Sequence, residues 1–257
     1  MKVNYAIPLL TQTESSNCVQ TSVAMLLSYY GHNLTANEIQ SKIPVRYDSL
    51  DKPYGTLLTD IAVWIKSLGL SVTLDCFDTE IIDRSWKNLT NDDIKRKLIQ
   101  LKESSRQTVI STEIRNAMID SYIKMLDSGA KLRISKLSRN LLGDLIKNGP
   151  FLPIVSYNYL YDAPRDRYFI KEKKYKTDDI EGKTTAHAIV VTGIENETVY
   201  VNDPDKTRGG QKSLPIDDVI SSIAIAQNKA SNWILSITGA TEIDSSRANR
   251  FPLRKSN

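Results

Sequence analysis

The sequence is poor in cysteine and histidine, with only Cys18, Cys76, His32 and His187 among 257 residues. Two cysteines cannot build a disulfide framework, and with two histidines they match no zinc-binding spacing. We therefore expect no metal and no other cofactor. Any chemistry must come from individual side chains. A histidine that acts as general base can only be His32 or His187.

Long apolar runs are also absent. No segment approaches the roughly 20 apolar residues needed to span a bilayer. The first ten residues carry one lysine, and Asn4 and Pro8 interrupt their apolar run, so they lack the build of a signal peptide. We expect no membrane association and a soluble protein, either cytoplasmic or delivered as an effector by a signal-independent route.

Charge of one sign is not in excess. The 34 basic and 30 acidic residues give a net charge of +4 and are well mixed along the chain, which argues against nucleic-acid binding. With 40% hydrophobic and 25% charged residues, the composition is that of a folded globular protein rather than a disordered one.

Helical patterns predominate in the first part of the chain and strand patterns in the last. The expected helices cover residues 18–30, 35–43, 57–68, 91–126 and 138–147. The expected strands cover residues 70–74, 152–157, 167–171, 186–193, 198–202 and 233–237. Helices followed by strands predict an α+β architecture with a helical N-terminal lobe and an antiparallel β C-terminal lobe. We expect one domain over residues 1–243, with a helical insertion at about 79–140, and a flexible polar tail at 244–257.

Cys18 is predicted to lie in the first turn of the helix that Gly31 ends. A helix N-terminus favours the thiolate, the form in which cysteine is a nucleophile. The alternative is that Cys18 is a small buried apolar residue, the commonest fate of a free cysteine. Gln12 lies six positions earlier in a polar loop, where its amide can join the Cys18 N–H in holding an oxyanion.

His187 and Asp203 are placed by a predicted hairpin. His187 begins one strand, residues 195–197 form a turn, and Asp203 follows the end of the returning strand, so both side chains reach the same end of the hairpin. A carboxylate bound to an imidazole fixes its tautomer and stabilises the imidazolium. Alone, each residue has a structural explanation. With Gln12 and Cys18 they supply a nucleophile, a base, an orienting group and an oxyanion donor.

The segment from Gln12 to Gly31, with Cys18 leading a helix, resembles the opening of the bacteriocin-processing double-glycine leader peptidases, a papain-like family. Residues 55–70, the segment 145–150 before a strand, and the segment from His187 to Asp203 resemble its later blocks in the same order. The resemblance implies a papain-like two-lobed fold and a peptide or protein substrate. It also implies Cys18 as nucleophile, His187 as base, Asp203 as third member and Gln12 as oxyanion donor. The family commonly has Asp-Cys-Gly where this chain has Asn-Cys-Val.

Three functions stay open at this point. A thiol peptidase would cleave a peptide bond through an acyl-enzyme on Cys18. A papain-like amidase, deamidase or acyltransferase would use the same residues with another acceptor. A non-catalytic binding module would keep the fold for recognition alone.

Other conspicuous residues are expected to be structural. We expect His32 to interact with the end of its helix or with solvent, and Cys76 to lie in the core. The tyrosine-rich run 157–161 is expected to pack the core or a sheet edge. The basic run 171–176 is expected to be a solvated loop, with an acidic partner as the alternative.

Overall fold

The structure, a computed structural model, describes residues 2–49, 51–106, 110–226 and 232–238. Its helices are α1 (Cys18–Tyr29), α2 (Ala36–Lys42), α3 (Leu58–Ser67), α4 (Asn91–Glu103), α5 (Thr112–Asp127), α6 (Arg139–Asn148), α7 (Tyr157–Leu160) and α8 (Ile216–Ala224), with short 3₁₀ turns at Arg84–Asn88 and Ile170–Glu172. Its strands are β1 (Lys2–Asn4), β2 (Arg46–Tyr47), β3 (Pro53–Gly55), β4 (Val72–Cys76), β5 (Lys131–Ile134), β6 (Phe151–Ser156), β7 (Asp166–Phe169), β8 (Lys174–Thr177), β9 (Ala186–Ala188), β10 (Val190–Glu195), β11 (Thr198–Asp203), β12 (Gly210–Pro215) and β13 (Trp233–Ile237). The α+β class expected from the sequence is confirmed.

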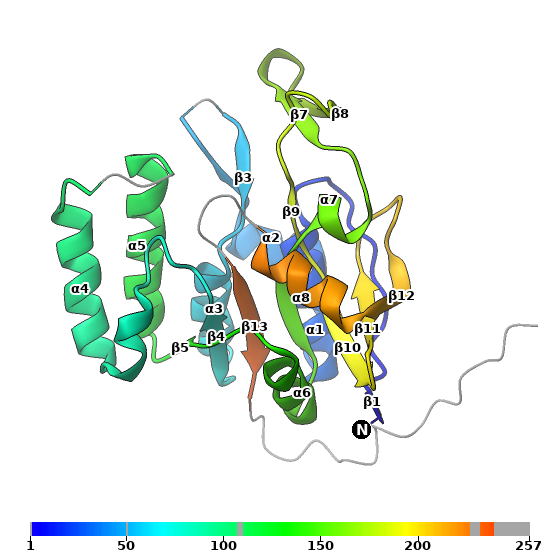
Figure 1. The fold of residues 1–257 in the computed structure, drawn as a ribbon, viewed down its shortest axis with the longest axis horizontal. Helices are drawn as coiled ribbons and strands as arrows, with labels where there is room; N and C mark the ends of the chain where they lie inside the picture. Colours follow the sequence, from blue (N-terminus) through cyan, green and yellow to red (C-terminus); the bar gives the residue numbers. More distant parts are fainter. Residues whose placement is uncertain (1, 50, 107–109, 227–231, 239–257) are drawn as a thin grey trace, which may run out of the picture.

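The central sheet has the strand order β12-β11-β10-β6-β13-β4-β5, with β1 added to β10 and β9 added to β6 (Figure 1). All pairs are antiparallel except β4 with β5, which is parallel. The hairpins β2–β3 and β7–β8 stand outside this sheet and project from the same end of the molecule in Figure 1.

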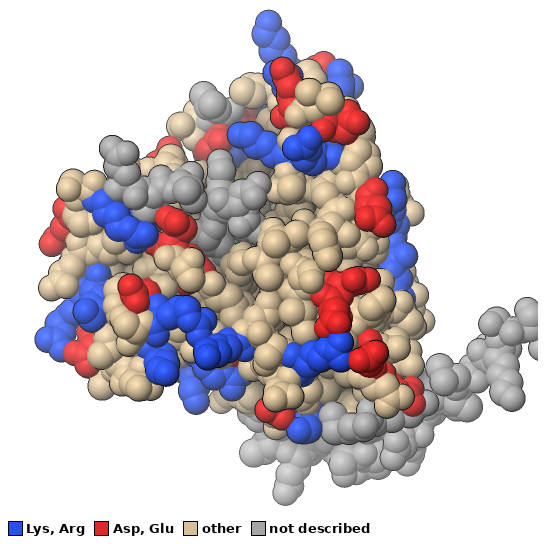
Figure 2. All heavy atoms as spheres, in the orientation of Figure 1, with Lys and Arg blue, Asp and Glu red and all other residues tan. Residues whose placement is uncertain are grey.

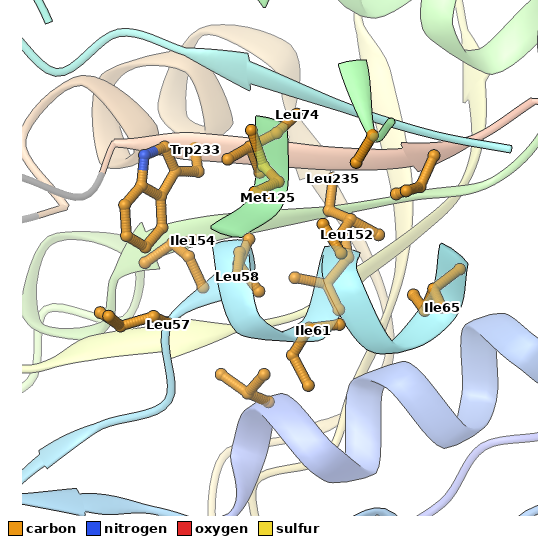
Figure 3. Close-up of a cluster of buried hydrophobic side chains, with 14 of the residues drawn as sticks. Leu57, Leu58, Ile61, Ile65, Leu74, Met125, Leu152, Ile154, Trp233 and Leu235 are labelled. Atoms are coloured by element: carbon orange, nitrogen blue, oxygen red, sulfur yellow. The ribbon is translucent and has the colours of Figure 1, made fainter. Parts of the chain in front are cut away.

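Both faces of the sheet centre are covered. Every residue of β6 and β13 is buried, which requires packing on both sides of these strands. On one face, Leu152 and Leu235 belong to the cluster formed with α1, α3 and α5 (Figure 3). On the other face, Phe151 and Ile234 pack with α6 and α8. Successive residues of a strand point to opposite faces, so each strand serves both cores.

The ends of α1 and α2 follow from their sequences. Gly31 has a φ of +86°, a left-handed conformation that glycine adopts without strain, and it ends α1 as expected. Thr35 and Glu38 form the predicted capping box at the start of α2, with each side chain bonded to the backbone N–H of the other. Local residues therefore determine where α1 ends and where α2 begins.

Several expected elements differ in extent. The strand expected at 70–74 is β4, two residues later, and the helix expected at 91–126 is two helices, α4 and α5. The segment 79–140, expected to be helical, also contributes β5 to the edge of the central sheet. The strand expected at 186–193 is interrupted at Ile189: β9 pairs with β6, and β10 pairs with both β6 and β11. The division into one domain and an insertion stays a prediction, and the tail at 244–257 lies outside the described residues.

Acidic and basic side chains are interspersed over the face shown in Figure 2, including the tip formed by β7–β8. Within the described ranges, no helix combines the length and the apolar character required to cross a membrane.

Candidate active site

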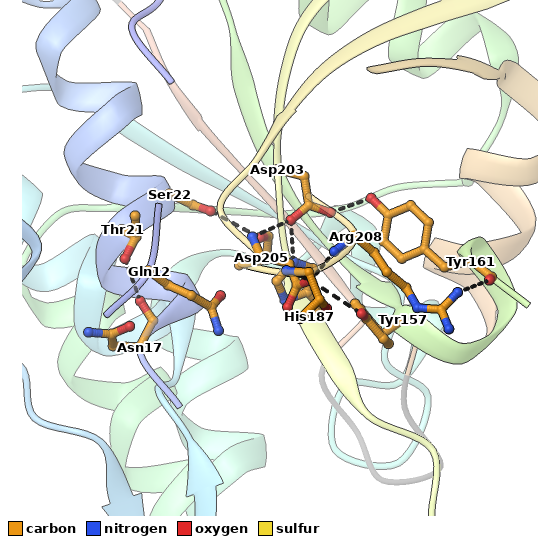
Figure 4. A network of polar contacts seen from close by, with 12 residues as sticks. Gln12, Asn17, Thr21, Ser22, Tyr157, Tyr161, His187, Asp203, Asp205 and Arg208 are labelled. Atoms are coloured by element: carbon orange, nitrogen blue, oxygen red, sulfur yellow. Dashed lines mark hydrogen bonds and ion pairs between the residues drawn. The ribbon is translucent and has the colours of Figure 1, made fainter. Parts of the chain in front are cut away.

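Helix α1 and strand β9 are held together beside Cys18. The Ser22 hydroxyl donates a hydrogen bond of 3.0 Å to the Ala188 carbonyl oxygen. Ser22 is four positions after Cys18 and so lies on the same face of the helix. Ala188 is the neighbour of His187 in β9. This buried bond brings the start of α1 against the residue that the sequence singled out as the base (Figure 4).

His187 is buried in β9, opposite Val155 of β6. Its Nε2 lies 2.8 Å from Asp203 Oδ1. The Cys18 thiol and the His187 ring also act on each other's ionisation, since the ring lowers the pKa of the thiol and the thiol raises the pKa of the ring. The structure thus brings Cys18, His187 and Asp203 into one continuous chain of contacts.

Asp203 ends β11 and is 1% exposed. Its Oδ1 also accepts a 2.8 Å bond from the Asp205 N–H, and its Oδ2 accepts a hydrogen bond from the Tyr161 hydroxyl. Both carboxylate oxygens are therefore occupied by donors. These two donors fix the orientation of the Asp203 carboxylate relative to the imidazole ring.

The pKa values of the three groups move in a linked pattern. Burial raises the pKa of the Cys18 thiol, but the hydrogen bond and charge of His187, with a bond from the Ala188 N–H, lower it below its usual value overall. Burial lowers the pKa of His187, but the bonds to Asp203 and Cys18 raise it to about 10. Burial opposes ionisation of Asp203, yet the bonds from His187 and Tyr161 hold the pKa of this carboxyl low. These shifts favour ionisation of the thiol and protonation of the ring relative to the isolated groups.

The N-terminus of α1 has no side-chain cap within the part of the chain that the structure describes. Cys18 is the first residue of the helix and is partly exposed, whereas Asn17 before it is fully buried. Among the described residues, no side chain caps the helix and no acidic residue stands in its first turn. Asn17 instead accepts a 3.2 Å bond from the Glu14 N–H and donates one of 2.9 Å to the Thr13 hydroxyl. It braces the preceding loop and leaves the first N–H groups of the helix without a side-chain cap.

Gln12 is buried in that same loop. Its backbone N–H donates a 2.8 Å bond to the Pro204 carbonyl, directly after Asp203. Its side-chain Nε2 donates a 3.0 Å bond to the Glu14 carbonyl, and its Oε1 has no hydrogen-bond partner among the described residues. An amide nitrogen carries two hydrogens, so one stays available after the bond to Glu14.

Sequence reasoning missed three residues that support this site. Tyr161 binds Asp203 directly, and the Tyr157 ring lies edge-on to the His187 ring at a centroid distance of 5.5 Å. Asp205 Oδ1 accepts bonds from the Tyr157 hydroxyl at 3.3 Å and from the Arg208 N–H at 2.7 Å. The expectation that the run 157–161 only packs the core or an edge was wrong for these two tyrosines. The signal was their position directly after a buried strand, β6, that pairs with β9.

The other residues set aside behave more simply. Cys76 lies in the core, as expected, with 1% of its surface exposed. The basic run 171–176 is not only a loop, because residues 174–176 belong to strand β8. No cluster of three or more potential metal ligands occurs in the described part of the chain.

The fold is of the cysteine-peptidase type, α+β and papain-like. The chain belongs to the Peptidase_C39 like family, whose family model matches residues 5–234. It is similar to the crystal structure of a C39-like peptidase from Bacillus anthracis, with 13% sequence identity, a TM-score of 0.47 and coverage of 94% of this chain and 100% of the other. It is also similar to a double glycine motif protease from an AMS/PCAT transporter, solved in complex with the leader peptide, with 13% identity, a TM-score of 0.42 and coverage of 93% and 98%. No curated protein matches the chain.

Proposed function

We propose that this protein is a cysteine peptidase that cleaves a peptide bond through an acyl-enzyme on Cys18. The observation that carries the proposal is the grouping of Cys18, at the uncapped N-terminus of α1, with His187, whose Nε2 lies 2.8 Å from Asp203 Oδ1. The family supports the class of enzyme, and the contacts support the assignment of roles.

Acylation begins with the Cys18 thiolate attacking the carbonyl carbon of the scissile bond. The C–S bond forms, and the carbonyl electrons move onto oxygen. Collapse of this tetrahedral intermediate breaks the C–N bond, while the His187 imidazolium gives its proton to the departing amine. The products of this step are a thioester on Cys18, a neutral His187 and the released C-terminal part of the substrate.

Deacylation uses the same groups in the opposite sense. Neutral His187 takes a proton from water as the water oxygen attacks the thioester carbon. The new C–O bond forms, the C–S bond breaks, and Cys18 leaves as thiolate beside the restored imidazolium. Asp203 keeps its charge throughout and holds the ring in place through Nε2.

The oxyanion of both steps needs hydrogen-bond donors. The backbone N–H of Cys18 lies in the uncapped first turn of α1, and Gln12 Nε2 has one hydrogen beyond its bond to Glu14. We assign these two donors to the oxyanion. A bonded and buried Gln12 is held in place before substrate arrives, which is the condition for electrostatic preorganisation.

The test is the pH dependence of Cys18 alkylation by iodoacetamide in Cys76→Ala protein, with and without His187→Ala. We expect fast alkylation well below the usual thiol pKa of about 8.5, and loss of this advantage in His187→Ala. As a control, circular dichroism and thermal unfolding are used to check that both proteins are folded. If Cys18 reacts like an ordinary thiol in both proteins, the enzyme assignment is wrong and the fold serves binding.

Peptide cleavage is separated from other thiol chemistry by mass spectrometry of products. Cleavage fragments a peptide, whereas a deamidase or an acyltransferase leaves its backbone intact. Cys18→Ala provides the control, because every product that depends on the thioester must disappear in that variant.

A further inference from the structure

A cavity of about 240 Å³ lies between the loop before α1 and the two hairpins outside the central sheet. Its lining includes Ser16 of the loop, Tyr47 and Pro53 of β2–β3, and Tyr168 and Tyr175 of β7–β8. Ser16 is two positions before Cys18. The cavity is therefore adjacent to the segment that presents the thiol, and its volume suits one large side chain.

The hairpins are joined around this cavity by specific bonds. The Tyr175 hydroxyl donates to the Pro53 carbonyl at 3.3 Å, and the Tyr168 hydroxyl donates to the Asp51 carbonyl at 3.5 Å. Lys173 Nζ lies 2.5 Å from Asp51 Oδ2. Because both hydroxyls are used in these contacts, the two tyrosines offer the cavity mainly their rings, whose centroids are 4.9 Å apart.

Hairpin β7–β8 has two chemically different faces. Tyr168 pairs with Tyr175, so their side chains share one face, and Asp166 lies two positions before Tyr168 on that same face. Arg167 and Lys176 pair with each other on the opposite face, where both stack on the Phe169 ring. The basic residues of these two strands therefore point away from the cavity.

Two carboxylates outside the lining, Asp166 and Asp48, act on Tyr175 of the cavity. The pKa of Tyr175 is raised to about 12, first by burial and also by the neighbouring carboxylates of Asp166 and Asp48. Asp51 belongs to the lining itself. Lys173 is the cation of the described lining, and it is paired with Asp51. Aromatic faces attract a cation, the more so with carboxylates nearby, and a guanidinium also stacks flat on such rings.

We propose that this cavity binds a basic side chain of the peptide substrate, arginine in preference to lysine, at a position close to the scissile bond. The inference rests on the proposed peptidase function and adds a substrate class to it. The tyrosines supply the stacking surfaces, and Asp166 supplies negative charge on the same side of the hairpin.

Short peptides that end in a chloromethyl ketone, which alkylates Cys18 with loss of chloride, test the proposal directly. Arginine is placed at each position in turn and compared with citrulline, which has nearly the same shape but no charge. At one position we expect the arginine probe to label Cys18 at least about tenfold faster, the effect of roughly 1.4 kcal/mol. Tyr168→Leu and Asp166→Asn should each lower the ratio of the two rates.

Phe169→Leu is the matched control, since it changes an adjacent aromatic residue on the opposite face of the same hairpin. It should leave the arginine to citrulline ratio unchanged. A ratio near one at every position, or an equal fall in Tyr168→Leu and Phe169→Leu, would overturn the proposal.

Iodoacetamide separates this test from that of the peptidase function, because the reagent is too small to use the cavity. An activated Cys18 with no arginine preference would leave the function standing and remove the inference. If Cys18 were not activated, binding of acetyl-arginine methylamide to Cys18→Ala, followed by NMR, would still test the cavity. Binding that Tyr168→Leu weakens supports the inference, and absence of binding overturns it.

Discussion

The two cysteines of this chain occupy opposite surroundings. Cys18 is partly exposed at the start of α1 and contacts an imidazole, which lowers its pKa. Cys76 is buried in β4, with its sulfur 3.2 Å from the Tyr122 hydroxyl, and burial together with the charge of Asp78 raises its pKa to about 12. The surroundings of the same side chain thus lower its pKa in one place and raise it in the other.

The opposite pKa shifts of Cys18 and Cys76 are caused by their neighbouring groups more than by the extent of their burial. Burial works against the ionisation of both thiols, although only Cys76 is fully enclosed. At Cys18 a cation compensates for that loss, whereas at Cys76 the nearest ionisable groups are a carboxyl and a phenol. A positive partner is what distinguishes the two sites.

The largest expected effect is the contrast in reactivity between the two thiols. At pH 6.5 in the native protein, iodoacetamide should label Cys18 more than about 1,000-fold faster than Cys76, because the second thiol is both protonated and enclosed. Peptide mapping of the labelled protein measures both rates in one sample. In concentrated urea the two rates should converge, and a persistent difference there would trace the contrast to local sequence.

A second buried titratable group, Asp78, lies near Cys76. Its carboxyl is 4% exposed, and Oδ2 has no hydrogen-bond partner among the described residues. Burial raises its pKa from 3.8 to about 6. A group with a raised folded pKa contributes stability below its unfolded pKa and loses that contribution as pH rises through its folded pKa.

Replacing Asp78 by Asn should therefore change the pH dependence of stability. Between pH 4 and pH 7 the free energy of unfolding of the wild type should fall by up to about 3 kcal/mol relative to Asp78→Asn. Urea unfolding of both proteins across this range measures the difference. A constant gap between the two curves would mean that Asp78 ionises normally.

The carboxylate of Asp203, which binds His187, should affect the reactivity of Cys18 and leave that of Cys76 unchanged. Asp203→Asn keeps the shape of the side chain and removes the charge that supports the imidazolium, so the Cys18 pKa should rise toward its usual value. We expect alkylation at pH 6 to slow by about 10- to 100-fold, which corresponds to the 1.5–3 kcal/mol of a charged hydrogen bond. Near pH 9.5 the variant and the wild type should converge, since an ordinary thiol is also ionised there. Equal slowing at both pH values would indicate a misplaced rather than a protonated thiol.

Local patterns in the sequence were sufficient for the elements that carry the proposed catalytic residues. The apolar spacing and Gly31 predicted α1 with Cys18 in its first turn, and short runs of β-branched or aromatic residues bounded by turn residues predicted the strands that hold His187 and lead to Asp203. These signals are local because a helix end and a strand end depend on few neighbours.

The sequence patterns did not predict the strands that lack a buried apolar face. Strand β8 is fully exposed, and β12 alternates only between exposed and half-buried residues at the sheet edge. Strand β5 owes its existence to parallel pairing with β4, nearly sixty positions earlier. Tertiary contacts such as that of Tyr161 with Asp203 join residues 42 positions apart and leave no periodic trace.

Tyr161 and Tyr157 offer the smallest and most selective test. The Tyr161 hydroxyl donates to Asp203 itself, whereas the Tyr157 hydroxyl donates to Asp205, which does not bind His187. Tyr161→Phe should slow Cys18 alkylation at pH 6 by about 2- to 10-fold, the value of one hydrogen bond of 0.5–1.5 kcal/mol. Tyr157→Phe removes a hydroxyl from the same short helical segment and should change the rate less. Equal effects of the two variants would mean that the tyrosines act through packing, and that Asp203 is oriented by His187 and the Asp205 N–H alone.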